Sequence, residues 1–291
     1  MKFFLFTVLF FIISNIYSLE NKIDKIVDPK ENIFIKIADG SLKIKSWDKN
    51  KVSIKGYYEN NIDKLIIEED NDKIIIKSEI KKNNLEKRIN IKTYIEIFLP
   101  EKSNIDIESS SASCEITGFS KNIIINSTSG NIKIDSNLEC LELFTISGNS
   151  DVKGSAKSFL GTTISGNFNI NGSFNILNLK SSSGDIILNE SIIKDINIFN
   201  TNGNIKIILP KFDNANCEIV NVRGNTFVSL SNPQNIEITI KSIKGKSKIN
   251  KNDFDSIQND KKILKLKKGN SNNFIFIETI TGEIEIENSE K

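Results

Sequence analysis

The stretch FTISGNSDVKGSAKSFLGTTISGNFNI, residues 144–170, contains the tetrapeptide ISGN twice, 18 residues apart. Glycines continue this count: they lie 18, 18 and 18 residues apart from Gly130 to Gly184, and then 19, 21 and 21 residues apart up to Gly245. The ten positions that occupy this place in the motif are Gly40, Ala112, Gly130, Gly148, Gly166, Gly184, Gly203, Gly224, Gly245 and Gly282. A motif that returns at a nearly fixed period indicates a stack of similar structural units.

Apolar residues keep fixed distances from each of these positions. They lie two and four residues after it, as do Ile132 and Ile134, and five and seven residues before it, as do Ile125 and Ile123. Polar residues separate them, and this period of two predicts short strands with one buried face. One pair of strands cannot bury its apolar face alone, whereas stacked pairs share a continuous core. We therefore predict an all-β fold, a parallel β-solenoid with about 18–21 residues per rung, capped by a more irregular N-terminal β region.

The ten repeated positions are interpreted as structural corners. At a corner the chain reverses within two residues, which favours glycine with a positive φ. The preceding serine is expected to bind the turn backbone, and the following asparagines are expected to form ladders. The alternative is a repeated ligand site of the kind found in calcium-binding solenoids, which needs an aspartate in every rung. Because Lys246 and Glu283 occupy that place in two rungs, we expect neither a metal nor a cofactor.

Three regions are expected along the chain. Residues 1–18 carry one lysine, an apolar run and small polar residues, which is the pattern of a signal peptide. Residues 19–104 are predicted to form an N-terminal β region that caps the stack, and residues 105–291 the solenoid repeat domain, with an insert near 250–273. The alternative for the leader is an uncleaved anchor, although its apolar run is too short for a good membrane span. We expect an exported protein, periplasmic or at the cell surface, with no transmembrane segment in the mature chain.

The composition excludes several kinds of chemistry. The 291-residue chain has no histidine, which removes Ser-His-Asp and Cys-His nucleophile systems and the commonest metal ligand. Its formal net charge is +2 and its arginines are Arg88 and Arg223, so no nucleic-acid surface is expected. Cys114, Cys140 and Cys217 lack the spacing of a zinc site. Because Cys114 and Cys217 fall at inward positions, we expect both to be buried.

Two charged stretches and the last strand leave alternatives open. EEDND, residues 68–72, lacks the spacing of an EF-hand loop, so a solvated turn is favoured over a calcium site. KKILKLKKG, residues 261–269, is amphipathic as a strand; it either contacts a membrane surface or an acidic polymer, or forms a solvated loop with one outer strand, which is favoured. The last strand, within GEIEIENSEK at 282–291, is expected to be a protected edge or a weak docking edge.

The corner motif also carries a family resemblance. The series NSTSGNIKI (126–134), FTISGNSDV (144–152), TTISGNFNI (162–170) and ETITGEIEI (278–286) resembles the bacterial DUF4097 family of β-strand repeat proteins. Members are often labelled adhesins and are related to the head-domain autotransporter adhesins. The segment DGSLKIKSWDKNKVSIKGYYE, residues 39–59, is similar to the usual opening of that family. The resemblance implies an exported β-solenoid with no known catalytic residues.

Three functions are compatible with the sequence. The leading hypothesis is a non-enzymatic, adhesin-like structural or binding module of the bacterial cell envelope, whose partner is an unknown protein, glycan or envelope polymer. An enzyme acting on polysaccharides is the first alternative, but it needs clustered carboxylates, and Glu115, Asp151 and Asp185 fall in separate rungs while Arg223 is isolated. A scaffold that self-associates end to end through uncovered strands is the second alternative.

Overall fold

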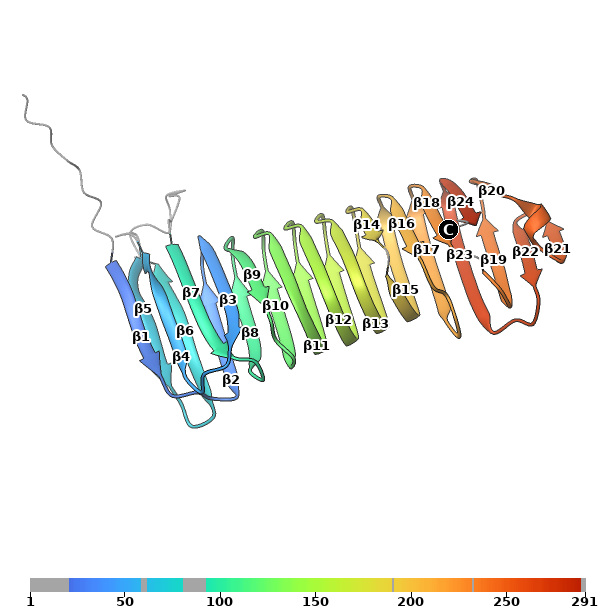
Figure 1. Ribbon diagram of the computed structural model, residues 1–291. Coiled ribbons are helices and arrows are strands. Elements are labelled where there is room, and N and C mark those ends of the chain that lie inside the picture. The colour runs from blue at the N-terminus through green and yellow to red at the C-terminus, as the bar shows by residue number, and fades with distance from the viewer. Residues whose placement is uncertain (1–20, 59–61, 81–92, 190, 232, 289–291) are drawn as a thin grey trace, which may run out of the picture.

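The computed structural model describes residues 21–58, 62–80, 93–189, 191–231 and 233–288, so the predicted signal peptide lies outside the described residues. Their regular structure consists of 24 strands and one short 3-10 turn, η2 (Lys251–Asp253). Figure 1 shows the strands side by side, across the axis of one elongated stack. Within the described residues, no helix has the length and hydropathy needed to cross a membrane. The all-β, solenoid-like fold expected from the repeat is confirmed.

Each rung contributes one strand before its corner and one after it, so the stack has two sides. We call the strands before the corners sheet A and the strands after the corners sheet B. Three long strands, β11, β12 and β13, run through the bend between two rungs and therefore belong to both sides. In spatial order, sheet A consists of β5 (Ile62–Glu69), β6 (Lys73–Ile80), β2 (Asn32–Ile37), β8 (Asn104–Ser109), β10 (Asn122–Ser127), the second halves of β11 (Ile132–Thr145), β12 (Ser150–Thr163) and β13 (Phe168–Ser181), then β15 (Ile192–Asn202), β17 (Asn216–Arg223), β23 (Asn273–Thr281), β19 (Ile236–Ser242), β22 (Ile263–Lys268) and β21 (Ser256–Asp260). Sheet B consists of β1 (Asn21–Val27), β4 (Val52–Tyr58), β7 (Thr93–Pro100), β3 (Ser41–Trp47), β9 (Ser113–Thr117), the first halves of β11, β12 and β13, then β14 (Ile186–Leu188), β16 (Ile205–Leu209), β18 (Thr226–Leu230), β24 (Glu283–Asn288) and β20 (Lys246–Ile249).

The period of the sequence sets the register of the stack. In the central rungs each residue lies beside the residue 18 positions further along, as in the pairs Leu141–Phe159 and Phe159–Leu177 of parallel neighbouring strands. These three side chains are fully buried, as the alternation predicted. Ser247 of β20 is exposed although it occupies an inward position, because β20 pairs only with β24 among the described strands.

Glycine is required at the central corners for a different reason from the one predicted. The corner glycines without a positive φ are Gly130, Gly148, Gly166, Gly184 and Gly245, and those with one are Gly40, Gly203, Gly224 and Gly282. At the first group, each corner lies directly against the backbone of its neighbour. A Cβ atom at Gly148 would be 1.9 Å from the carbonyl oxygen of Gly130, and one at Gly166 would be 2.0 Å from that of Gly148. Close backbone stacking, rather than a left-handed conformation, excludes a side chain there.

Hydroxyl groups complete the central corners. The backbone N–H of Gly148 donates to Oγ1 of Thr145 at 3.1 Å, and the N–H of Gly166 donates to Oγ1 of Thr163 at 2.9 Å. The serine before the glycine bonds to backbone, as expected, but to that of the preceding rung: Ser165 Oγ donates to the carbonyl oxygen of Ile146 at 3.1 Å. The corner motif therefore holds both its own turn and its neighbour.

The residue after each corner forms the expected ladder. In each step, a side-chain oxygen accepts a hydrogen bond from the backbone N–H one rung further along the stack. The ladder runs through Asn131, Asn149, Asn167, Asp185, Asn204, Asn225 and the N–H of Glu283. Asp185 continues it as well as the asparagines do, because each step requires only an acceptor oxygen.

The rungs near both ends are not stacked in the order of the sequence. β23 and β24, the last two strands of the chain, lie between β17/β18 and β19/β20 (Figure 1). The expectation that the last strand is an edge was therefore wrong: β24 is interior, with Ile284 and Ile286 buried. At the other end, β2 and β3 lie between β6/β7 and β8/β9. Any pair of strands with apolar residues at the inward positions can pack between two rungs in this way. Sequence order alone therefore does not determine the order of the rungs in the stack.

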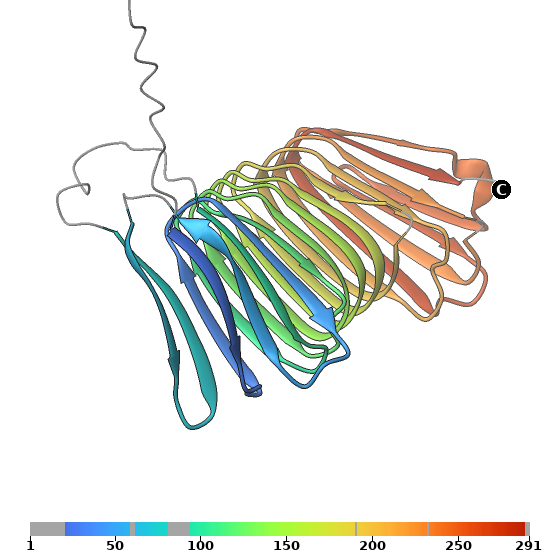
Figure 2. The same ribbon diagram turned by 60° about the vertical axis from the view of Figure 1, so that its left-hand side comes forward.

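Antiparallel strands cover the ends of the stack (Figure 2). At the N-terminal end, β4 pairs antiparallel with β7 and β1 with β4, while β5 pairs antiparallel with β6. At the C-terminal end, β22 pairs antiparallel with β19 and carries β21 on its outer side. A change from parallel to antiparallel pairing therefore interrupts the repeat at three of the four sheet ends, whereas β20 ends sheet B with parallel pairing to β24.

Candidate functional site

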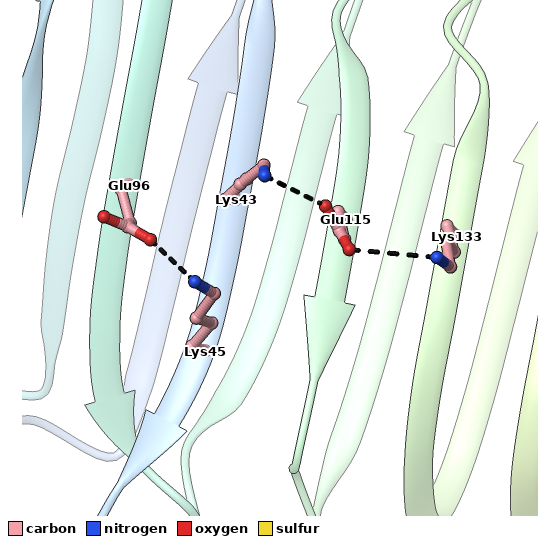
Figure 3. A network of polar contacts seen from close by, with 5 residues as sticks. All are labelled: Lys43, Lys45, Glu96, Glu115 and Lys133. Atoms are coloured by element: carbon pink, nitrogen blue, oxygen red, sulfur yellow. Dashed lines mark hydrogen bonds and ion pairs between the residues drawn. The ribbon is translucent and has the colours of Figure 1, made fainter.

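The two outer faces of the stack differ in chemistry. The outer face of sheet B, face B, carries ion pairs between neighbouring rungs: Glu115 lies 3.4 Å from Lys43 and 3.9 Å from Lys133, and Glu96 lies 2.8 Å from Lys45 (Figure 3). Such exposed pairs contribute little to stability, because water screens them. Together with the asparagine ladder, they nevertheless satisfy charges and hydrogen-bonding groups of this face within the protein.

The outer face of sheet A, face A, exposes large apolar side chains. Six of them, with 38–46% of their surface exposed, are Ile124, Phe144, Leu160, Ile176, Phe199 and Phe274. Of the described large apolar side chains exposed to this extent, only Ile26 of β1 lies on a strand of sheet B. Ile124, Phe144 and Leu160 line one shallow hollow across β10, β11 and β12, which we call the central apolar patch. Grouped exposed apolar side chains are typical of an interaction surface.

A longer hollow lies on face A towards the C-terminal end. This hollow, the C-terminal groove, crosses five adjacent strands, β13, β15, β17, β23 and β19, and has a volume of 360 Å³. Its outward-facing lining residues are Asn178, Asp195, Asn197, Asn216, Glu218, Glu237, Thr239, Phe274 and Phe276. Buried residues such as Ile196 and Cys217 form its floor. Aromatic, amide and carboxylate groups therefore meet in one concave site, the combination that favours binding of a polar ligand.

A third hollow on face A has chemistry related to that of the C-terminal groove. It lies across β6, β2, β8 and β10, and Phe34 lines it together with Asn32, Asn104 and Asn122. Here the amides bond to one another: Asn104 Nδ2 donates to Asn32 Oδ1 at 3.1 Å, and Asn122 Nδ2 donates to Asn104 Oδ1 at 3.2 Å. Because these groups are already partnered, this hollow offers fewer free hydrogen-bonding groups than the C-terminal groove does.

The structure places the candidate enzymatic carboxylates apart and gives each a structural contact. Glu115 is ion-paired on face B, Asp151 accepts a hydrogen bond from Asn169 Nδ2 at 2.9 Å, and Asp185 belongs to the corner ladder. Arg223 is exposed at the end of β17. Within the described part of the chain, no three acidic or cysteine side chains are grouped so as to hold a metal ion.

The cysteines and the two charged stretches, 68–72 and 261–269, lie in ordinary structural elements of the fold. Cys114 and Cys217 are buried, as predicted, and burial raises the pKa of both thiols to about 12. The segment 68–72 contains the tight turn between β5 and β6, in which Asp70 N donates to the carbonyl oxygen of Lys73 at 2.9 Å. In β22, Leu264 and Leu266 are buried while the lysines between and after them face outward, so this outer strand is amphipathic as expected.

Sequence reasoning missed the C-terminal groove. Its two phenylalanines come from β23, and Phe274 lies beside Asn216, which is 58 residues earlier in the chain. The signal that was available is the outward column of the repeat, six and eight residues before each corner. If the rungs are placed in sequence order, however, these columns keep Phe274 and Phe276 apart from the carboxylates of β15 and β17.

Comparisons with known proteins agree with this architecture. A solved structure from Parabacteroides distasonis ATCC 8503, described as a "putative lipid binding protein", is 15% identical, covers 92% of this chain and 96% of its own, and has a TM-score of 0.59. A "putative adhesin" from Parabacteroides merdae ATCC 43184 is 13% identical, with coverage of 92% and 96% and a TM-score of 0.55. No curated protein matches the sequence. The family model described as Toastrack DUF4097 matches residues 30–287, and the chain therefore belongs to the Toastrack DUF4097 family.

Proposed function

We propose that this protein is an exported, non-enzymatic, adhesin-like module of the cell envelope that binds its partner through face A. The observation that carries the proposal is the contrast between the two faces. Both faces carry ion pairs, such as Lys43–Glu115 on face B and Lys241–Glu278 on face A, but of the described large apolar side chains that are exposed, only Ile26 lies on a strand of sheet B. Face A instead exposes Phe144, Leu160 and Phe274 beside concave hollows. An exposed apolar surface next to hollows is the usual mark of a binding face.

Export is supported by the leader pattern of residues 1–18 and by the adhesin-like description of a structural neighbour. The test is a C-terminal tag followed by protease treatment of intact and of permeabilised cells. Degradation in intact cells indicates the cell surface, and degradation only after permeabilisation of the outer barrier indicates the periplasm; both outcomes support export. Cofractionation with the cytoplasm, with residues 1–18 still attached, would contradict it.

The end of sheet B supports a second candidate function, end-to-end self-association. β20 pairs with β24 on one side, and no described strand pairs with its other side. An unpaired edge is able to accept a strand from another molecule. Light scattering over a range of concentrations tests this candidate: growing particles that disappear in a Ser247→Pro variant support it, and a monomer at every concentration contradicts it.

A further inference from the structure

We propose that the C-terminal groove binds a linear glycan whose sugars carry amino groups, with the glycan lying along the axis of the stack. This inference rests on the proposed function of face A and names the ligand class and the site. The groove is a row of side chains that repeats from strand to strand. Five adjacent strands span about 19 Å, because neighbouring strands are about 4.8 Å apart.

The shape of the groove favours a linear ligand with a short repeat. One row of side chains runs Asn178, Asn197, Glu218, Phe276, Thr239, and the parallel row runs Asp195, Asn216, Phe274, Glu237. Each strand therefore presents a similar pair of outward positions at each step along the axis. A pyranose unit in an extended polysaccharide is about as long as this step of about 4.8 Å, so successive sugars meet successive strands.

The aromatic side chains supply the apolar part of the contact. Phe274 and Phe276 lie two residues apart on β23 and point to the same face, because side chains alternate along a strand. Phe274 is 46% exposed, although phenylalanine has no polar group that water solvates. A flat ring held in this way stacks on the C–H face of a pyranose ring and also attracts a nearby ammonium group.

The polar side chains of the groove are available to a ligand. Asn216 Nδ2 donates to Asp195 Oδ1 at 3.1 Å, and this is the one side-chain hydrogen bond within the described lining. The side chains of Asn178, Asn197 and Glu218 have no hydrogen-bond or ion-pair partner among the described residues, in contrast to the laddered asparagines. Amides that both donate and accept match sugar hydroxyl groups, which also do both.

The charge of the groove selects the kind of glycan. Asp195, Glu218 and Glu237 line it, and no lysine or arginine is among the described residues of its lining. The nearest lysines in register are Lys265 and Lys267 of β22, which lie opposite Thr239 and Glu237 at the outer end. Asp195 of β15 and Glu218 of β17 have no ion-pair partner among the described residues. Carboxylates repel polyanions such as nucleic acids and acidic polysaccharides, and they form strong charge-assisted hydrogen bonds with ammonium groups. An amino sugar satisfies both the carboxylates and the aromatic rings.

The test is calorimetric titration of the purified full chain with a β-1,4-linked glucosamine hexamer, at a pH at which its amines are protonated. We expect saturable binding that weakens about tenfold in Phe274→Ala and at least about tenfold in the double variant Asp195→Asn, Glu218→Gln. The matched controls are Phe227→Ala and Asp135→Asn, which lie on face B outside this groove and should bind as the unmodified protein does. The N-acetylated hexamer, which lacks the charges, should bind about tenfold more weakly.

Three results would overturn the assignment: no binding of the glucosamine hexamer, equal loss of affinity in the two control variants, or equally tight binding of hexalysine, which has the charges without the sugar rings. Thermal unfolding of each variant confirms that the stack is intact, since none of the five positions is buried. Because the titration uses purified protein, its failure would remove the glycan from the groove without deciding whether the protein is exported or binds through face A.

Discussion

The backbone N–H of Asn167 donates to the side-chain Oδ1 of Asn149 at 3.1 Å, which links the corner of one rung to the corner of the next. The same link joins Asn149 to Asn131, also at 3.1 Å. These bonds connect residues 18 positions apart, so they stabilise the stack rather than any single turn. The ladder explains why asparagine follows glycine in the central motif.

The ladder predicts a specific order of stabilities at position 149. Asn149→Ala removes the acceptor for the N–H of Asn167 and should lower the free energy of unfolding by about 1 kcal/mol. Asn149→Asp keeps an acceptor oxygen, as Asp185 does naturally, and should cost less. Urea unfolding of the two variants measures the difference. If the alanine and aspartate variants lose the same free energy of unfolding, the ladder is not a stabilising element.

The corner glycines predict a steric rather than a conformational penalty. Gly148→Ala places a Cβ atom 1.9 Å from the carbonyl oxygen of Gly130, so neighbouring rungs must move apart, at a cost of more than about 2 kcal/mol. Gly148→Asn should be at least as costly, because the site lacks the positive φ that asparagine tolerates. Ser147→Ala, beside it, is the control and should cost less than about 1 kcal/mol. A well-tolerated Gly148→Asn in thermal unfolding would restore the conformational explanation.

The interior position of β24 is testable with one matched pair of residues. Ile286 of β24 lies beside Ile249 of β20 in the same inward column, but Ile286 is buried while Ile249 is only half-buried. Ile286→Ala should therefore cost about 2–4 kcal/mol of unfolding free energy, and Ile249→Ala about 1 kcal/mol. If the rungs were stacked in sequence order, the last strand would be the outermost one and Ile286→Ala would be the milder change.

The different burial of the three cysteines predicts which of them an alkylating reagent labels first. Burial raises the pKa of Cys114 and Cys217 to about 12, whereas Cys140 on face A is partly exposed. An alkylating reagent should modify Cys140 first in the native protein, which mass spectrometry detects.

The two buried thiols also predict a pH dependence of stability. The folded chain keeps the protons of Cys114 and Cys217 at pH values at which the unfolded chain has lost them, so the free energy of unfolding should fall as pH rises from 9.0 towards 12. Stability that is constant over this range would contradict the burial of these thiols.

The repeat made the fold predictable, but only locally. The inward columns around Gly148 and Gly166 specify strand, bend and register within neighbouring rungs, because a shift of one residue would expose every apolar side chain. They do not specify which rung is the neighbour, since Ile284 and Ile286 fill an inward column equally well in the interior or at the end. The swapped order of the last rungs was therefore not foreseeable from the columns.

The same limit explains why the C-terminal groove was not predicted from the sequence. The C-terminal groove exists because β23 lies beside β17 and brings Phe274 next to Asn216. Gly148 was predicted correctly as a corner, but for the wrong reason. Glycine meets either of two needs at a corner: a positive φ or the absence of a Cβ atom. A sequence records the residue and not which of these needs it serves.

The most direct test of the central claim, that face A is the binding face, compares two triple variants. One carries Phe144→Ser, Leu160→Ser and Phe274→Ser on face A, and the other carries Glu115→Ser, Lys133→Ser and Glu285→Ser on face B. The measurement is the affinity of each purified protein for cell envelopes prepared from cells that lack it. The face A variant should lose more than about tenfold in affinity, and the face B variant should stay within about twofold of the unmodified protein. Equal affinities for the two variants, or a greater loss on face B, would contradict the claim.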